Sequence, residues 1–173
     1  MAAQSDSHWA VEIDPATYVL DGYSLHARLY PEQLPKWRLG AGIYSLEFPG
    51  AFVDMNSDNR DEGWDVDLKQ GVGLFMERYL NQERNGWFAG LQLGYQKYNL
   101  ENPDLAPSGT HYEALVVMPY AGYLYELTPQ WYIQGWAGVG YNEKLSGRTV
   151  IATEEYDLSS VITFATLHIG YKF

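Results

Sequence analysis

The last fifteen residues of the chain, Ser159 to Phe173, alternate strictly between two faces. One face is mostly apolar and carries Val161, Thr163, Ala165, Leu167, Ile169, Tyr171 and Phe173. The other face is mixed and carries Ile162, Phe164, Thr166, His168, Gly170 and Lys172. Successive side chains of a β-strand point to opposite sides, so this stretch predicts a two-faced strand. It is longer than most strands of water-soluble domains, and a long tilted strand is what a bilayer requires.

The same alternation recurs along the rest of the chain and predicts seven further strands. They cover Trp9 to Leu20 with an interruption at Asp14-Pro15, then 23–30, 36–48, 64–80, 87–99, 111–127 and 131–143. The connections 31–35, 81–86 and 128–130 are short, whereas 49–63, 100–110 and 144–157 are long. Alternating short and long connections are typical of outer-membrane barrels.

These patterns predict an all-β fold, an eight-stranded antiparallel up-and-down transmembrane β-barrel with a plugged polar interior. We expect one domain over 1–173, with a flexible N-terminal segment at 1–8. A barrel of about eight strands is just wide enough for side chains to fill it, so we expect no open aqueous pore. An even strand count places both termini on the same side of the membrane.

The end of the chain also resembles a known family. Tyr171-Lys172-Phe173, preceded by Leu167 and Ile169, is similar to the closing strand of small bacterial outer-membrane barrels of the OmpA/OmpX kind. The resemblance implies a monomer in the outer membrane of a Gram-negative cell, with its termini in the periplasm. Acidic residues collect in the expected loops, which suggests divalent cations or the cation-bridged lipopolysaccharide surface as partners, together with the lipids of the outer membrane.

Composition excludes several other classes of protein. No run of 18 apolar residues exists and the mean hydropathy is -0.32, so we expect no transmembrane helix. The net charge of -11 argues against nucleic acid as a partner, since phosphates require Lys and Arg. The chain has no Cys, which agrees with a chain that crosses the periplasm and needs no disulfide. Residues 1–4 have neither the basic segment nor the apolar core of a signal peptide, so we expect a mature form with an added or retained Met.

Aromatic residues gather where the expected strands meet the connections, which predicts two aromatic girdles at the membrane interfaces. They are Trp9, Tyr30, Trp37, Trp64, Tyr79, Trp87, Tyr98, Tyr112, Tyr125, Trp131, Tyr141, Tyr156 and Tyr171. The alternative is that Tyr and Trp are simply favourable residues in strands.

Charged and imidazole side chains fall on the faces that we expect to point inward. They are His26, Arg28, Arg38, Lys69, Glu77, Glu126, His168 and Lys172. Buried charges need partners, so we expect Arg28, Arg38 and Lys172 to pair with Glu77 and Glu126 in a structural network near the periplasmic end. The two histidines are expected to form interior hydrogen bonds. The alternative is catalytic, with His26 acting together with Glu126.

The acidic loop at 54–65 resembles the calcium-binding loop of EF-hands. Its oxygen-bearing residues at the corresponding positions are Asp54, Asn56, Asp58, Glu62 and Asp65. Asn59 stands where that loop needs a left-handed backbone, Asp61 replaces an apolar residue, and Asp65 is shorter than the usual bidentate Glu. This loop either binds Ca²⁺, which would be the only cofactor of the chain, or is a solvated acidic loop that binds no metal ion.

Pro15 and Pro119 lie where strands should pair, and each removes a ladder hydrogen bond. We therefore expect lateral seams there, unless each proline marks a bulge or strand end. The segments 13–16 and 116–121 loosely resemble the PagP lipid A palmitoyltransferase barrels, whose prolines open lateral routes for lipid tails. Residues 18–23 lack the His of that family, and Ser57-Asp58 is reversed relative to its Asp-Ser pair.

Three functions are compatible with these patterns. The first is a non-enzymatic barrel whose acidic loops contact lipopolysaccharide, divalent cations or external partners, and we favour it. The second is an enzyme that modifies lipid A or phospholipids, with lateral access near the two prolines. The third, a soluble ligand-binding barrel, fits least because such a barrel places its apolar residues inside.

Overall fold

A computed structural model describes residues 8–173, and nearly all of them lie in strands or in the turns between strands. The elements are β1 (His8–Ile13), α1 (Pro15–Val19), β2 (Tyr23–Tyr30), β3 (Trp37–Glu47), α2 (Gly50–Val53), β4 (Asp65–Tyr79), β5 (Gly86–Glu101), β6 (Thr110–Glu126), β7 (Trp131–Gly147), β8 (Val150–Ile151), β9 (Glu154–Glu155) and β10 (Val161–Lys172). No helix in this part of the chain is long and apolar enough to cross a membrane.

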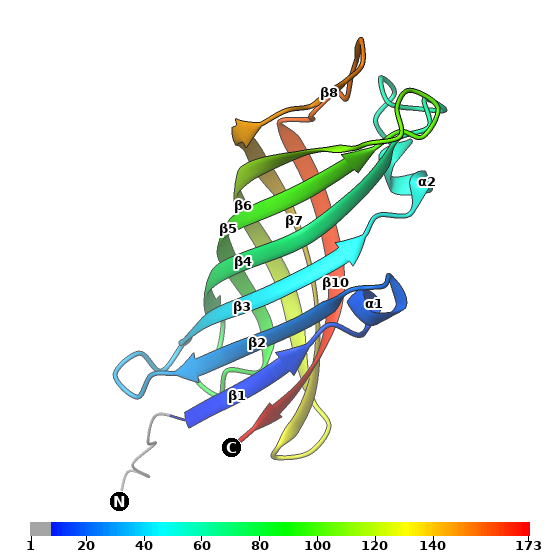
Figure 1. Ribbon diagram of the computed structural model, residues 1–173. Helices are drawn as coiled ribbons and strands as arrows, with labels where there is room; N and C mark the ends of the chain where they lie inside the picture. Colours follow the sequence, from blue (N-terminus) through cyan, green and yellow to red (C-terminus); the bar gives the residue numbers. More distant parts are fainter. Residues whose placement is uncertain (1–7) are drawn as a thin grey trace, which may run out of the picture.

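Eight of these strands form one closed barrel in the order β1-β10-β7-β6-β5-β4-β3-β2, and every neighbouring pair is antiparallel (Figure 1). The predicted eight-stranded up-and-down barrel is therefore confirmed. The start of β1 and the C-terminus lie at one end together with the short connections, and we call this the terminal end. The long connections and both short helices project toward the other end, the loop end.

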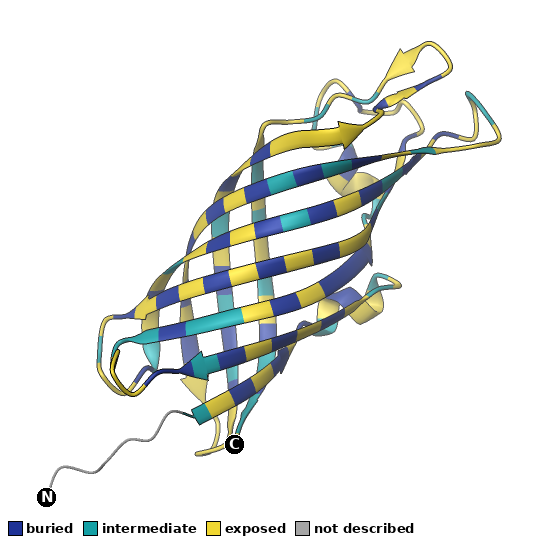
Figure 2. Cartoon of the chain, turned by 60° about the vertical axis from the view of Figure 1, so that its left-hand side comes forward, coloured by how far each residue is buried: buried dark blue, intermediate teal, exposed yellow. Residues whose placement is uncertain are grey.

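Burial alternates along each strand, as Figure 2 shows by its stripes. The outward residues at mid-barrel form an apolar belt, which includes Leu25, Ile43, Val72, Leu74, Met76, Leu91, Leu93, Val117, Val139 and Leu167. Burying so large an apolar surface requires a hydrocarbon solvent, so the belt identifies the surface that faces lipid. The inward face holds glycines, aromatic rings and charged groups, which confirms the predicted orientation of the strands.

The first strand is shorter than predicted. It ends at Ile13, and Pro15 begins helix α1 instead of interrupting a strand that continues to Leu20. Pro suits the first turn of a helix because its missing N–H has no partner there anyway. Asp14 caps the helix, and its carboxylate accepts a hydrogen bond from the Ala16 backbone N–H at 2.9 Å.

The segment 144–157 is more regular than the predicted loop. Strand β7 continues to Gly147, and β8 and β9 form a small hairpin beyond it. At the other terminus, residues 1–7 of the expected flexible segment lie outside the described residues. His8 belongs to β1, and its ring stacks on Tyr30 at a centroid distance of 4.4 Å.

Only some of the expected girdle residues face outward. Trp9, Trp87, Tyr125 and Trp131 are exposed around the terminal end, where amphipathic rings suit a membrane interface. Other aromatic residues of the predicted girdles point inward and are buried in the barrel core, namely Tyr30, Trp64, Tyr79, Tyr98 and Tyr112. An eight-stranded barrel must fill its interior with side chains, and these rings do so. The position of an aromatic residue near a strand end does not reveal whether its ring points inward or outward.

Candidate functional site

The interior of the terminal half is organised around the carboxylate of Glu12, which comes from β1 and is fully buried. Its Oε2 accepts a hydrogen bond from Arg28 Nε at 2.7 Å and lies 3.0 Å from His168 Nδ1. Its Oε1 accepts from Arg38 Nη1 at 2.8 Å and from the Tyr132 hydroxyl at 2.7 Å. One carboxylate therefore joins side chains from four other strands.

A second carboxylate, that of Glu77 on β4, completes the cluster. Arg38 Nε donates to Glu77 Oε2, and the Tyr120 hydroxyl donates to Glu77 Oε1 at 2.9 Å. Arg28 Nη1 lies 3.8 Å from Glu77 Oε1. The two guanidinium groups thus balance the two carboxylates, and their attraction offsets part of the desolvation cost of burying these charges. We call Glu12, Arg28, Arg38 and Glu77 the plug.

The sequence placed three of the plug residues on inward faces but missed Glu12. The signal was present, because Glu12 alternates with the outward-facing Trp9, Val11 and Ile13. The ion pairs therefore differ from the predicted ones. Arg28 and Arg38 both pair with Glu12 as well as with Glu77.

Of the remaining members of the predicted network, His168 contacts Glu12 of the plug, whereas Lys69, Glu126 and Lys172 do not join it. Lys172 donates to Glu126 at the terminal end, where the Glu126 side chain is partly exposed. His26 is buried against the rings of Phe75 and His168, at centroid distances of 5.4 and 4.8 Å. The structure therefore does not bring His26 and Glu126 together as a catalytic pair.

The prediction that Lys69 faces inward is wrong. Its side chain is 58% exposed and pairs with Asp67 at 2.7 Å on the outside. The register between β4 and β5 shifts between Leu68 and Gln70. A β-bulge inserts one residue into the alternation and so changes which side chains face inward. Leu68 is consequently buried, and Lys69 faces out beside Asp67.

The five residues of the calcium hypothesis do not converge in the structure. Within residues 8–173, no group of three or more His, Cys, Asp or Glu side chains is close enough to hold a metal ion. Asp54 accepts a hydrogen bond from the Asp61 backbone N–H, whereas the Asn56 amide donates to Asp157. Asp58 and Glu62 are exposed on the loop, and Asp65 is exposed at the start of β4. Calcium binding here stays a prediction.

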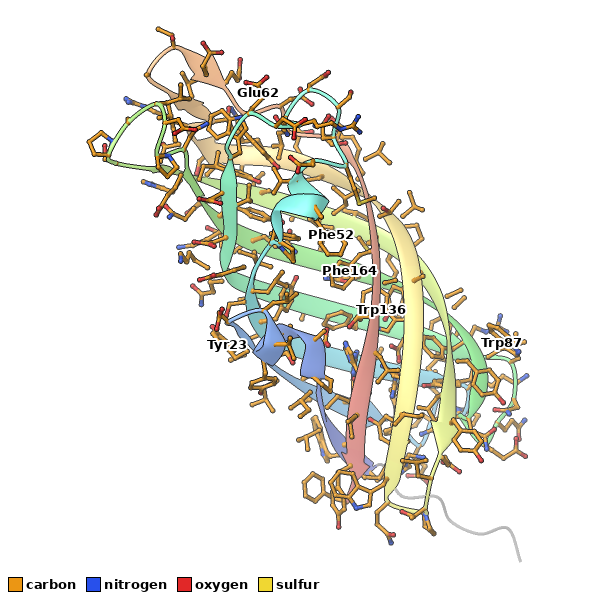
Figure 3. The ribbon with its side chains drawn as sticks, turned by 90° about the vertical axis from the view of Figure 1, so that its right-hand side faces the viewer. Tyr23, Phe52, Glu62, Trp87, Trp136 and Phe164 are labelled. Carbon is orange, nitrogen blue, oxygen red and sulfur yellow. The ribbon has the colours of Figure 1, made fainter. Side chains whose placement is uncertain are left out.

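The loop-end half of the barrel contains a cavity of about 510 Å³, located between the plug and the loops. Its walls are largely apolar and include Phe52 of α2, Trp136 of β7 and Phe164 of β10, which Figure 3 labels. The Trp136 and Phe164 rings are in contact at a centroid distance of 5.5 Å. His26 and His168 also line the cavity, and the hydrogen bond of His168 to Glu12 joins it to the plug.

Polar groups in the cavity wall mostly bond to one another. The Tyr44 hydroxyl accepts from Gln92 at 3.1 Å and from Gln96 at 3.0 Å. The Ser24 hydroxyl contacts the backbone of Asp14 and accepts from its N–H at 2.6 Å. Burial raises the pKa of Tyr156, in the loop before β10, so its hydroxyl at the cavity mouth stays neutral.

The two prolines of the predicted seams lie at two kinds of discontinuity. Pro15 follows the end of β1, as described above. Pro119 is paired with Leu91 of β5, but on its other side the register between β6 and β7 stops at Val117–Tyr141 and resumes at Tyr120–Gly138. A proline has no N–H to donate at that position. Neither proline lines the cavity.

Chemically, the site can seal the lumen and surround an apolar guest. Among the described residues, the Ser24 hydroxyl on the cavity wall is bonded to backbone rather than to an imidazole, so it is not arranged as an activated nucleophile. Several buried atoms in this region have no hydrogen-bond partner, including His26 Nδ1 and both terminal nitrogens of Arg28.

No protein-family model and no curated protein matches the chain. Among solved structures, it is similar to the N-terminal β-barrel domain of Pseudomonas aeruginosa OprF, with a TM-score of 0.57 and 11% identity over 98% of each chain. A major outer membrane protein from Thermus thermophilus aligns with a TM-score of 0.47 and 14% identity, over 98% of this chain and 100% of that one. The first likeness, together with the closed ring of eight strands, shows that this chain has the fold of an OmpA-like outer-membrane β-barrel.

Proposed function

We propose that the chain is a small integral protein of the bacterial outer membrane that works without catalysis. Its termini lie in the periplasm and its acidic loops face outward, where they contact lipopolysaccharide, divalent cations or external partners. The observation that carries the proposal is the combination of an apolar outer belt with a lumen closed by the plug. Such a barrel anchors and presents its loops rather than conducting solutes.

The closed lumen supports a role other than transport. All four plug side chains are at most 1% exposed, and they draw on β1, β2, β3 and β4. Opening a water path would separate paired charges, and breaking one buried pair costs about 3–5 kcal/mol. We therefore expect no steady ion conductance from the protein in planar bilayers.

The loop end supports contact with a cation-bridged surface. Acidic side chains are concentrated there, namely Asp54, Asp58, Asp61, Glu62, Asp65, Glu101, Asp104, Glu154, Glu155 and Asp157. Carboxylates and lipid phosphates repel each other unless Mg²⁺ or Ca²⁺ lies between them. Binding of lipopolysaccharide should therefore require divalent cations and disappear when a chelator is added.

The orientation can be tested by cysteine labelling, because the chain has no Cys. Ser57→Cys places a thiol on an exposed residue of a long loop, and Gln130→Cys places one in an exposed short turn at the terminal end. A membrane-impermeant maleimide should label the first variant in intact cells and the second only after permeabilisation. The reverse result would overturn the proposed orientation.

A lipid-modifying enzyme is the second candidate, and the apolar cavity beside His26, Ser24 and Asp14 favours it. The contacts of Ser24 with the Asp14 backbone weigh against it. Incubation with radiolabelled phospholipid and lipid A, comparing the wild type with His26→Asn, would detect acyl transfer or deacylation. Turnover that this variant abolishes would replace the non-enzymatic proposal.

A further inference from the structure

The cavity lies at a place where the ring of strands is incomplete over much of its height. β1 pairs with β10 only from Ala10–Lys172 to Ile13–Ile169. β10 itself begins at Val161 and pairs with β7 from that residue onward. In the described chain, the edge of β10 from Val161 to His168 therefore has no strand beside it on the β1 side.

Helix α1 fills only part of this gap. The Thr166 hydroxyl donates to the Asp14 carboxylate, which ties β10 to the start of α1. The far end of α1 is held to β3, where Glu47 N donates to Leu20 O at 2.8 Å. The stretch of β10 nearer the loop end lies beyond these ties, and Figure 3 shows it opposite α2 and Phe52.

The cavity reaches this gap. Its lining includes both faces of β10 there, the inward residues Ile162 and Phe164 and the outward residues Val161 and Thr163. A cavity that passes around the open edge of β10 borders both of its faces in this way. Ile162 and Phe164 are also only half-buried, unlike the inward residues of the fully paired strands.

The chemistry of the cavity selects an uncharged, apolar guest. Its walls are rich in aromatic and aliphatic side chains, and no Lys or Arg of the described chain lines it. A carboxylate or phosphate placed inside would meet no cation there and would lie close to Asp14 and Asp157. Where one strand is missing, its two neighbours lie about 9.6 Å apart, twice the usual strand spacing of about 4.8 Å, and the free width of one strand suits a single extended alkyl chain.

We propose that this cavity binds one acyl chain of a bilayer lipid, which enters sideways between β10 and the helices α1 and α2 while its head group stays at the membrane surface. The volume lies within the range of about 300–1,000 Å³ that is usual for small-ligand pockets. The proposal rests on the membrane location proposed above. It adds a specific lipid contact to a barrel that is otherwise closed.

The test uses Trp136, which lines the cavity, and lipids that carry bromine on their acyl chains, because bromine quenches indole fluorescence at short range. The protein is refolded into vesicles of brominated phosphatidylcholine. Subtracting the signal of Trp136→Phe isolates the contribution of that residue from those of the other Trp side chains. We expect clear quenching of Trp136 in the wild type.

A matched pair of substitutions separates the cavity from the outer surface. Val116 is buried and lines the cavity, whereas its neighbour Val117 is exposed on the outer face of β6. Val116→Phe fills the cavity and should remove most of the Trp136 quenching, whereas Val117→Phe should leave it unchanged. Leu46→Phe, which also fills the cavity, serves as a second variant if the first does not fold. Equal quenching in the filled and control variants would overturn the proposal.

Two further measurements distinguish a failure of the cavity proposal from a failure of the proposed membrane location. Outward-facing Trp87 and Trp131 should be quenched by brominated lipid whenever the barrel is in the bilayer. If they are quenched and Trp136 is not, the cavity proposal is wrong and the proposed function stands; if none is quenched, the membrane location itself is wrong. A bromine-labelled fatty acid added from water should quench Trp136 weakly. Quenching by this acid alone would overturn lateral entry from the bilayer.

Discussion

Replacing the buried carboxylate of Glu12 should destabilise the barrel far more than the same replacement at its surface. Glu12 faces two guanidinium groups, with Arg28 Nε at 2.7 Å and Arg38 Nη1 at 2.8 Å. Glu12→Gln keeps the size of the side chain but leaves two buried cations against the one remaining carboxylate of the plug. A charge pair at about 4 Å is worth roughly 4 kcal/mol at an effective dielectric constant of about 20.

The measured loss should be smaller than the sum of two such pairs, because the Gln side chain can still accept one hydrogen bond and Glu77 keeps both cations partly balanced. Breaking a buried ion pair by removing one partner costs about 3–5 kcal/mol, and we expect that loss for Glu12→Gln. Glu126→Gln is the matched control. It breaks a partly exposed pair with Lys172 and should cost about 0–1 kcal/mol.

The assay is reversible unfolding in urea from lipid vesicles, followed by Trp fluorescence and extrapolated linearly to zero denaturant. Adding Arg28→Met to Glu12→Gln restores the charge balance and should recover part of the lost stability. Equal losses for the two single variants, or no recovery in the double variant, would refute the account of the plug as a set of mutually dependent charges.

Three further predictions concern the faces of the strands and the acidic loop. Leu167→Arg places a charge in the apolar outer belt and should cost about 2–4 kcal/mol in the same unfolding assay, whereas Thr166→Ser on the inner face keeps its hydroxyl and should cost little. Equal effects would mean that the faces are assigned wrongly. Gly170→Ala would bring a methyl group within 2.1 Å of a buried tyrosine ring and should cost about 1–3 kcal/mol, whereas Gly135→Ala, whose nearest neighbour would be at 3.9 Å, should be close to neutral. A loss at the second glycine as large as at the first would contradict the packing described for the lumen. If the loop 54–65 binds Ca²⁺, titration calorimetry with millimolar Ca²⁺ should give a heat that Asp58→Ala removes, and the absence of such a heat would refute the calcium site.

The barrel could be predicted from the sequence because each strand has one face toward lipid and one toward the lumen, so apolar residues alternate with glycine and polar residues along it. That requirement defined β2 at Tyr23–Tyr30 and placed the other long strands to within a few residues of their ends. Alternation fails where the backbone leaves the regular ladder. The bulge before Gln70 turned Lys69 outward, and Pro15 started a helix that shortened the first strand.

The site was harder to predict than the fold because it depends on contacts between distant strands. Arg28, Arg38 and Glu77 could be placed inside, yet which charge meets which follows from the register around the ring. Glu12 escaped prediction although it alternates with the outward-facing Val11 and Ile13, because its role comes from contacts with residues of four other strands. The cavity could not be predicted because its walls combine inward side chains of strands that are far apart in the sequence with residues of the loops.

The short ladder between β1 and β10 has a consequence for biogenesis. The join that closes the ring links residues 10–13 to residues 169–172, and the Phe173 N–H donates to Trp9 O at 2.9 Å. The two partners are separated by nearly the full length of the polypeptide, so their encounter carries the largest loop-closure entropy of any strand pairing in the described barrel. Until both ends have arrived, the nascent sheet has two open edges that can pair with an assembly factor or another sheet. We therefore expect the two terminal strands to meet last, and Glu12 gains its contacts with His168 of β10 and Tyr132 of β7 only when they do.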